Sequence, residues 1–201
     1  MEETVNSVPG GARPAATVQS TSVAHSIAYI AVFAALVAVL GLPGNIPLPG
    51  LVPITAQTLG VMLAGAVLGA RRGALSMILF LALVAMGLPL LSGGRGGLGV
   101  FVGPSAGYMI AWVVGAAVVG LVVRSGSGRP TWLKAFAGCV LGGMITLYVI
   151  GIPVQAAVTG MSLGQTFTAS LLFLPGDLIK AVIASIVTMG LWKAYPRAFH
   201  Q

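Results

Sequence analysis

Six long apolar stretches, separated by short segments rich in glycine, proline and polar residues, dominate the chain. They span residues 23–40, 54–70, 73–91, 105–123, 132–150 and 169–192. Each is near the length that an α-helix needs to cross about 30 Å of hydrocarbon. The pattern predicts an all-α membrane protein with six transmembrane helices.

The segments outside these stretches set the domain boundaries. Residues 1–22 are polar and are predicted to form a disordered cytoplasmic tail, 23–195 a single membrane domain, and 196–201 a short cytoplasmic C-terminal tail. Glu2 and Glu3 stand where a signal peptide needs positive charge, so the first apolar stretch is interpreted as an uncleaved helix. The segment 151–168 leaves room for a further, partly helical piece at the level of the membrane.

The amino-acid composition indicates that the chain folds in a lipid bilayer and not in water. The 201 residues are 57% hydrophobic and only 6% charged, with a mean hydropathy of +1.03. Soluble domains carry about 25% charged residues. This chain has too few charged residues to form a water-facing surface, so we expect it to lie in a lipid bilayer. In a membrane protein a net charge of +7 reflects orientation more than nucleic-acid binding, and no nucleic-acid partner is expected.

The distribution of basic residues predicts that orientation. With six spans, the two termini and the second and fourth loops lie on one side, and the eight basic residues there are Arg13, Arg71, Arg72, Arg124, Arg129, Lys134, Lys193 and Arg197. The opposite side holds only Arg95. Cytoplasmic loops carry an excess of Lys and Arg, so both termini are predicted to be cytoplasmic. The loops 41–53, 92–103 and 151–168 then face outward.

The sequence "LPGDLIKAV" places Asp177 and Lys180 inside the last apolar stretch, near its outer end. Residues three apart share a helix face. Each charge costs about 2.5–3.5 kcal/mol at mid-membrane on the insertion scale, so such residues usually face a cavity or each other. Two interpretations stay open at this point: a structural ion pair, or a polar ligand site open to the outside.

The outward segment "SGGRGGLGVFVGP" is the second candidate for binding. Its glycines, among them Gly94 and Gly97, permit close backbone approach, and their free N–H groups suit an anion. Arg95 is suited to carboxylate recognition. The alternative is a mobile surface loop with an incidental arginine. The segment does not match a nucleotide-binding glycine loop.

Three further features each allow two interpretations. Gln57, at the outer end of the second helix, either bonds neighbouring helices or contacts a ligand. Tyr108 is either an interfacial aromatic residue or a wall of the pocket. The first helix carries small residues at four-residue spacing, including Ala31 and Ala35, which allow close helix packing within the chain or with a partner.

Motifs for other functions are missing from the sequence. There is no HExxH, no GxSxG, no second carboxylate near Asp177 and no ATP-binding motif. Cys139 is the only cysteine, and no Cys/His spacing suggests a metal site. We expect no enzyme activity, no catalytic residue and no cofactor, but a binding or permeation role, with any ATP used by partner subunits.

Three motifs give the chain a resemblance to a known family. "VPITAQTLGVMLAGAVLGARRGALS", "GGRGGLGVFVGPSAGYMIAW" and "LPGDLIKAVIAS" together resemble the BioY family, the biotin-binding S components of energy-coupling-factor transporters, over about residues 25–195. The resemblance implies a six-helix protein of the prokaryotic plasma membrane that captures biotin from outside. It also implies an energising module, made of a transmembrane coupling subunit and two cytoplasmic ATPase subunits.

The resemblance also implies roles for individual residues. The family's "PGDLxK" motif falls on Pro175 to Lys180, so its biotin-binding Asp and Lys correspond to Asp177 and Lys180. Docking to the coupling subunit through small residues of the first helix corresponds to Ala31 and Ala35. Position 95 varies in the family, so the resemblance supports a ligand-binding role for Arg95 less than it does for Asp177 and Lys180.

Helical spacing places the ligand more closely. Residues at i and i+3 have Cβ atoms about 5–6 Å apart, so Asp177 and Lys180 address one end of biotin, the ureido ring. The carboxylate would then lie toward Arg95 or glycine amides. The alternatives are an S component for a different vitamin, or a structural membrane subunit in which the Asp–Lys pair only holds helices together.

Overall fold

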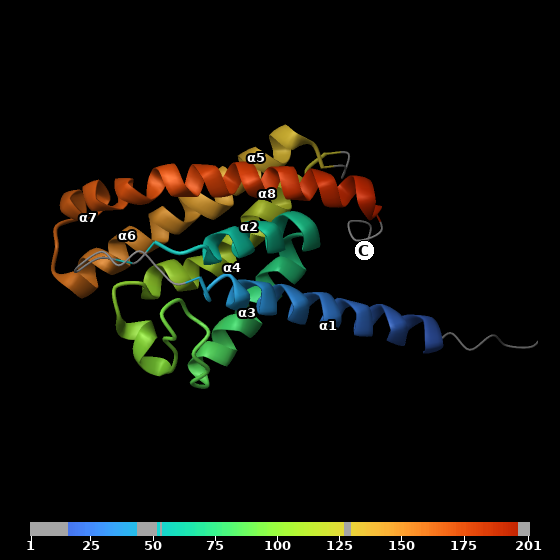
Figure 1. The fold of residues 1–201 in the computed structure, drawn as a ribbon, viewed down its shortest axis with the longest axis horizontal. Helices are drawn as coiled ribbons and strands as arrows, with labels where there is room; N and C mark the ends of the chain where they lie inside the picture. Colours follow the sequence, from blue (N-terminus) through green and yellow to red (C-terminus); the bar gives the residue numbers. More distant parts are fainter. Residues whose placement is uncertain (1–15, 44–51, 53, 127–129, 197–201) are drawn as a thin grey trace, which may run out of the picture.

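The structure is a computed structural model that describes residues 16–43, 52, 54–126 and 130–196. Within these residues every named element is helical (Figure 1). The α-helices are α1 (Ala16–Val39), α2 (Gln57–Leu68), α3 (Ala70–Ala85), α4 (Ala106–Val123), α5 (Trp132–Val140), α6 (Thr146–Thr159), α7 (Leu163–Ser170) and α8 (Leu174–Ala194). Short 3-10 or π turns join them: η1 (Leu98–Val102), η2 (Leu141–Ile145) and η3 (Leu171–Phe173). The all-α fold class is confirmed.

Helix α4 is the centre of the bundle and packs against α2, α3, α5 and α6. Small residues allow these helices to approach closely. A Cβ on Gly115 would lie 2.6 Å from the carbonyl oxygen of Gly142, and one on Gly120 would meet the backbone of Ala70. Phe80 and Trp112 fill the space between α3 and α4, with ring centroids 5.9 Å apart. Such contacts hold the helices together where lipid provides no hydrophobic driving force.

The second and third helices are shorter than the apolar stretches that predicted them. They meet at Gly69, whose φ of +82° makes a sharp turn. Arg71 and Arg72, expected to separate two helices, instead lie in the first turn of α3. The predicted third span extends to Leu91, past the end of α3 at Ala85, and Leu91 begins a turn that its backbone pairing with Arg95 closes.

The fifth predicted span is longer than expected. α5, η2 and α6 run on from Trp132 to Thr159 as one apolar rod, and Pro153 lies inside it. Proline removes one helical hydrogen bond but does not have to end a membrane helix. The rod ends at Gly160, which has left-handed backbone angles typical of a helix C-terminus.

Two helices, α7 and α8, occupy residues 163–194, where the sequence predicted a single apolar stretch from 169 to 192. A reciprocal cap between Ser162 and Gln165 begins α7. This helix is the additional piece for which segment 151–168 left room. α8 then begins at Leu174 with Pro175 in its first turn, so Asp177 lies at its N-terminal end as predicted.

Within the part of the chain that the structure describes, three apolar helical stretches are long enough to cross a membrane: Ala106–Val123, Trp132–Thr159 and Leu163–Ala194. Val23–Val39 and Gln57–Leu68 are shorter apolar helices. α1 itself begins at Ala16, earlier than hydropathy predicts, because neutral residues continue the helix beyond its apolar part. The predicted tails at 1–15 and 197–201, and most of loop 41–53, lie outside the described residues.

Candidate ligand-binding site

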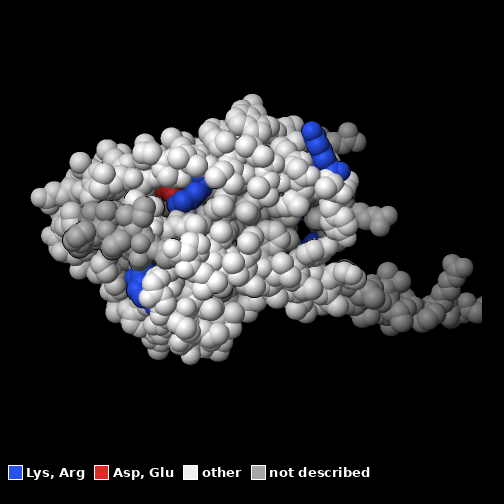
Figure 2. Space-filling model, in the orientation of Figure 1, with Lys and Arg blue, Asp and Glu red and all other residues white. Residues whose placement is uncertain are grey.

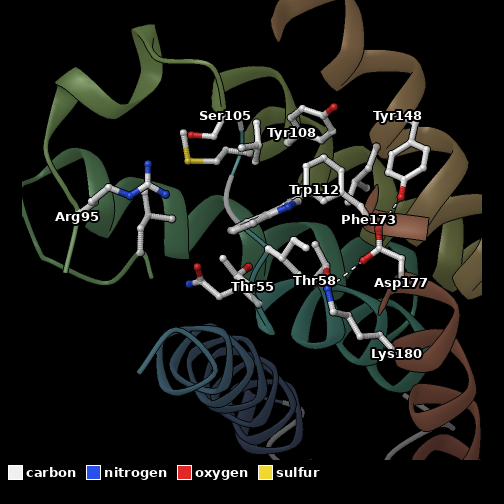
Figure 3. Close-up of a pocket in the computed structure, with 16 residues that line it drawn as sticks. Thr55, Thr58, Arg95, Ser105, Tyr108, Trp112, Tyr148, Phe173, Asp177 and Lys180 are labelled. Atoms are coloured by element: carbon white, nitrogen blue, oxygen red, sulfur yellow. Dashed lines mark hydrogen bonds and ion pairs between the residues drawn. The ribbon is translucent and has the colours of Figure 1, made fainter. Parts of the chain in front are cut away.

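A pocket lies at the N-terminal end of α8, between that helix, α2, α4 and α6 (Figure 3). It encloses about 640 Å³ that no protein atom fills, including its open mouth. Its lining residues are Val52, Ile54, Thr55, Gln57, Thr58, Leu91, Arg95, Ser105, Tyr108, Met109, Trp112, Leu147, Tyr148, Phe173, Asp177 and Lys180. The lining is mostly apolar with a few polar groups, which is typical of sites for small organic molecules.

Asp177 and Lys180 form the charged end of this pocket. Lys180 Nζ lies 2.9 Å from Asp177 Oδ1, as the helical spacing predicts. The Asp177 side chain is 8% exposed and that of Lys180 15%. Figure 2 shows one place where acidic and basic atoms lie side by side at the surface. The pair is therefore almost buried but can be reached from the pocket.

Two neighbours from other helices hold the pair in position. The hydroxyl of Tyr148 on α6 donates to Asp177 Oδ2 at 2.7 Å. Lys180 Nζ donates to Thr58 Oγ1 on α2 at 2.9 Å. A carboxylate has about four lone-pair sites and an ammonium three N–H groups, so each charge keeps capacity for a ligand. The local charge is balanced, which favours an uncharged polar group there.

Arg95 lies on the opposite side of the pocket from this pair (Figure 3). Its Nε donates to the carbonyl oxygen of Ser92 at 3.2 Å, which orients the guanidinium. Among the described residues that line the pocket, Asp177 is the only acidic one. The Arg95 guanidinium can therefore bind a negatively charged group at the other end of a ligand.

Gln57 holds the segment that carries Arg95. Its side chain is 1% exposed, and its Nε2 donates to the carbonyl oxygens of Val37 and Leu90. Its Oε1 accepts from the backbone N–H of Ser92 at 3.1 Å. Of the two interpretations from sequence, the structure favours bonding between neighbouring segments, because the Gln57 amide is engaged with backbone.

The predicted glycines contribute through the shape of this segment. Gly94 and Gly97 have φ of +68° and +82° but do not line the pocket. The N–H of Gly97 donates to Val84 O, so it is engaged within the chain. Gly94 lies in the turn that brings Leu91 and Arg95 together. The structure does not bring either residue into the pocket.

Aromatic side chains form the wall between the two polar ends. Tyr108 is 7% exposed, and its hydroxyl bonds Gln155 and Ser170 within the protein, so its ring faces the pocket as a wall. Trp112 lies beside it (Figure 3), and its buried indole N–H has no hydrogen-bond partner among the described residues.

Sequence reasoning missed several of these residues. Tyr148, Trp112 and Phe173 lie within apolar stretches, where an aromatic residue usually indicates packing. Tyr148 lies near the end of the stretch predicted at 132–150, where a tyrosine is typical of the membrane interface, so its position did not mark it as part of the site. Thr58 was considered from sequence together with Thr55 and Gln57 at the outer end of the second helix, but Gln57 was preferred as the ligand contact.

Comparisons with known proteins agree on one family. The BioY family model matches residues 12–197. The biotin transporter BioY of Rhizobium etli is 46% identical over 172 residues, covering 83% of this chain and 92% of the relative. The biotin transporter BioY of Rhodobacter capsulatus is 45% identical over 186 residues, covering 87% of this chain and 96% of the relative.

A solved structure has a similar fold. The crystal structure of the S-component for biotin from an ECF-type ABC transporter matches with a TM-score of 0.79 at 32% identity. The match covers 88% of this chain and 94% of that chain.

Proposed function

The chain belongs to the BioY family, and from this premise we propose that it is the biotin-binding S component of an energy-coupling-factor transporter. The observation that carries the proposal is one pocket with the Asp177–Lys180 pair at one end and Arg95 at the other. Biotin has the matching arrangement, with a neutral ureido ring at one end and a carboxylate at the other.

The ureido ring is assigned to the Asp177–Lys180 end. Its N–H groups can donate hydrogen bonds to the Asp177 carboxylate. Its carbonyl oxygen can accept a hydrogen bond from the remaining N–H group of Lys180. The pair carries no net charge, so an uncharged group bound there leaves no charge unbalanced. Tyr148 and Thr58 hold both side chains in position before the ligand arrives, which reduces the cost of ordering them.

The other parts of biotin are assigned to the remaining lining. Tyr108, Trp112 and Phe173 provide the apolar wall for the bicyclic ring and the chain. Arg95 is assigned to the carboxylate, because a guanidinium forms strong charge-assisted hydrogen bonds with this group. Gln57 acts indirectly, by fixing Ser92 and with it Arg95.

We assign the protein six membrane crossings, with both termini cytoplasmic, in the plasma membrane of a prokaryote. The asymmetry of basic residues supports this orientation. The described chain begins and ends at the same end of the molecule, and the N-terminus of α8 lies at the opposite end (Figure 1). The pocket then opens outward, where biotin is captured.

The partner surface is assigned to α1. Ala31 and Ala35 are exposed, whereas Ala34 on the same helix is 2% exposed and packs inward. Small exposed residues one turn apart let another helix approach closely. We assign this surface to the coupling subunit, which would connect the chain to two cytoplasmic ATPase subunits; the chain itself needs no cofactor.

Replacing Ala31 by leucine tests this assignment. The larger side chain should keep the partner helix at a distance and reduce recovery of the coupling subunit about tenfold or more, as overpacking predicts. The measurement is co-purification of the subunits from cells that express all of them. Ala157→Leu, at an exposed alanine of α6, is the matched control. Equal recovery with both variants would contradict the assignment, and biotin binding should be unchanged in each.

A further inference from the structure

The ring of Tyr108 packs directly against the backbone of Gly151, a buried glycine of α6. A Cβ built on Gly151 would lie 2.5 Å from Cε1 and 2.6 Å from Cγ of Tyr108. Carbon atoms in contact are normally about 3.5–4.0 Å apart, so no larger residue fits between this backbone and the ring. Tyr108 lines the ligand pocket, and Gly151 is not among the described residues that do. The ring therefore lies between Gly151 and the pocket.

Hydrogen bonds hold the far end of the same ring. The Tyr108 hydroxyl donates to Gln155 Oε1 on α6 at 3.0 Å and bonds Ser170 Oγ, at the end of α7, at 3.1 Å. Gln155 and Ser170 are both buried. The Cβ of Tyr108 is fixed on α4, and its hydroxyl is bonded to α6 and α7. Pressure from position 151 would therefore tilt the ring toward the pocket.

The packed ring lies near the charged end of the pocket. Gly151 follows Tyr148 by three residues on α6, and residues three apart share a helix face. The Tyr148 hydroxyl donates to Asp177 Oδ2 at 2.7 Å, and both tyrosines line the pocket (Figure 3). A group fused to the ring that binds Asp177 would therefore lie against Tyr108.

Biotin has such a group. A sulfur-containing ring is fused to its ureido ring, and this second ring makes the ligand wide where the pocket is bordered by Tyr108. A ureido ring without a fused partner needs less width. The space that the absent side chain of Gly151 leaves for Tyr108 is therefore space that the second ring can use.

We propose that Gly151 is a positioning residue that makes the pocket wide enough for a bicyclic ligand, by letting the Tyr108 ring lie back against α6. The inference rests on the proposed function, since it takes the ureido ring to lie at the Asp177–Lys180 pair. It extends that function to the preference for two fused rings over one. Gly151 acts through Tyr108 and touches no ligand itself.

The test compares two ligands by titration of the purified full chain in detergent. One is biotin, and the other is dethiobiotin, which has the ureido ring and a carboxylate chain but lacks the sulfur-containing ring. Gly151→Ala should bind biotin about tenfold more weakly and dethiobiotin less than about threefold more weakly, because an added methyl group has no room in a close-packed contact. The ratio of the two affinities is the readout, and a general loss of stability would not change it.

Tyr108→Leu removes the ring through which Gly151 is proposed to act. In this background Gly151→Ala should change the ratio of affinities by less than about twofold, because the effects of residues in contact do not add. Thermal unfolding without ligand gives a second measurement of the same contact. Gly151→Ala should lower the unfolding midpoint more in the unmodified protein than in Tyr108→Leu, even if the single variant is severely destabilised.

Gly107→Ala is the matched control. A Cβ on Gly107 would lie 2.5 Å from Cβ of Val154, so this variant crowds the same two helices, α4 and α6, to a similar extent. Neither Gly107 nor Val154 is among the described residues that line the pocket. Its ratio of affinities should equal that of the unmodified protein. An equal change in this ratio would show that the spacing of the helices, and not the Tyr108 ring, sets the preference.

Three further results would overturn the inference and leave the proposed function intact. They are unchanged biotin binding by Gly151→Ala, equal weakening of both ligands, and an undiminished effect of Gly151→Ala in the Tyr108→Leu background. If the unmodified protein bound neither ligand, the proposed function would itself be wrong, and the inference that rests on it would fail as well.

Discussion

Replacing Asp177 by asparagine is expected to weaken biotin binding by about two to three orders of magnitude. The Asp177 side chain is 8% exposed and is bound to Lys180 and Tyr148 at 2.9 and 2.7 Å. Removing one member of a buried ion pair costs about 3–5 kcal/mol of folding stability, because the other charge is left without compensation, and this disturbs the site that binds biotin. The substitution also removes the acceptor assigned to the ureido N–H groups. Isothermal titration of the purified variant with biotin provides the measurement.

A second variant separates binding from stability. Asp177→Asn combined with Lys180→Gln leaves no unpaired charge, so its thermal unfolding midpoint should exceed that of Asp177→Asn alone. It should still fail to bind biotin tightly, because both assigned ureido contacts are changed. If the pair only held helices together, the double variant would recover biotin binding along with its stability. Unchanged affinity of the single variant would also contradict the assignment.

Replacing Arg95 by glutamine is expected to weaken biotin binding about ten- to a hundred-fold. Charge-assisted hydrogen bonds contribute about 1.5–3 kcal/mol, and the substitution removes the charge that the carboxylate would meet. Biotin methyl ester lacks this negative charge, so its affinity should change little. The measurement is a comparison of both ligands by titration against both proteins.

The two ligands also control for indirect effects. Arg95 Nε bonds Ser92, so the substitution also removes a contact within the segment. A disturbed segment would weaken biotin and its ester equally, and this result would contradict the carboxylate assignment. A loss for biotin alone would support it. Lower ionic strength should increase the difference, since exposed charges are then screened less.

Features that depend on neighbouring residues could be predicted from the sequence. The Asp177–Lys180 contact follows from i,i+3 spacing, and the start of α8 follows from Pro175. The all-α class follows from apolar stretches that are much longer than strands. Each of these inferences needs one short segment and a known helical geometry.

Features that depend on distant residues could not be predicted. Thr58 and Lys180 are 122 positions apart, yet they share a hydrogen bond, and only the packing of α2 on α8 brings them together. The same holds for Gln57, whose partners come from α1 and from the segment before Arg95. The local sequence around a side chain does not show whether that side chain bonds distant backbone groups or faces a ligand.

The other differences between the sequence prediction and the structure lie at the ends of helices and in the loops that join them. The fifth apolar stretch was predicted to end at residue 150, but the rod continues to Thr159 with Pro153 inside it, because a membrane helix tolerates the lost hydrogen bond. The glycines of residues 92–99 suggested amides facing a ligand. In the structure Gly94 shapes the turn that carries Arg95 instead.

Biotin binding by the purified chain, without partner subunits, tests the central claim most directly. The account predicts that the protein in detergent binds about one biotin per chain, and that excess thiamine or riboflavin does not displace it. Titration with labelled biotin, with Asp177→Asn as the weak-binding reference, measures this. Absence of binding, or tight binding of a different vitamin in its place, would contradict the account.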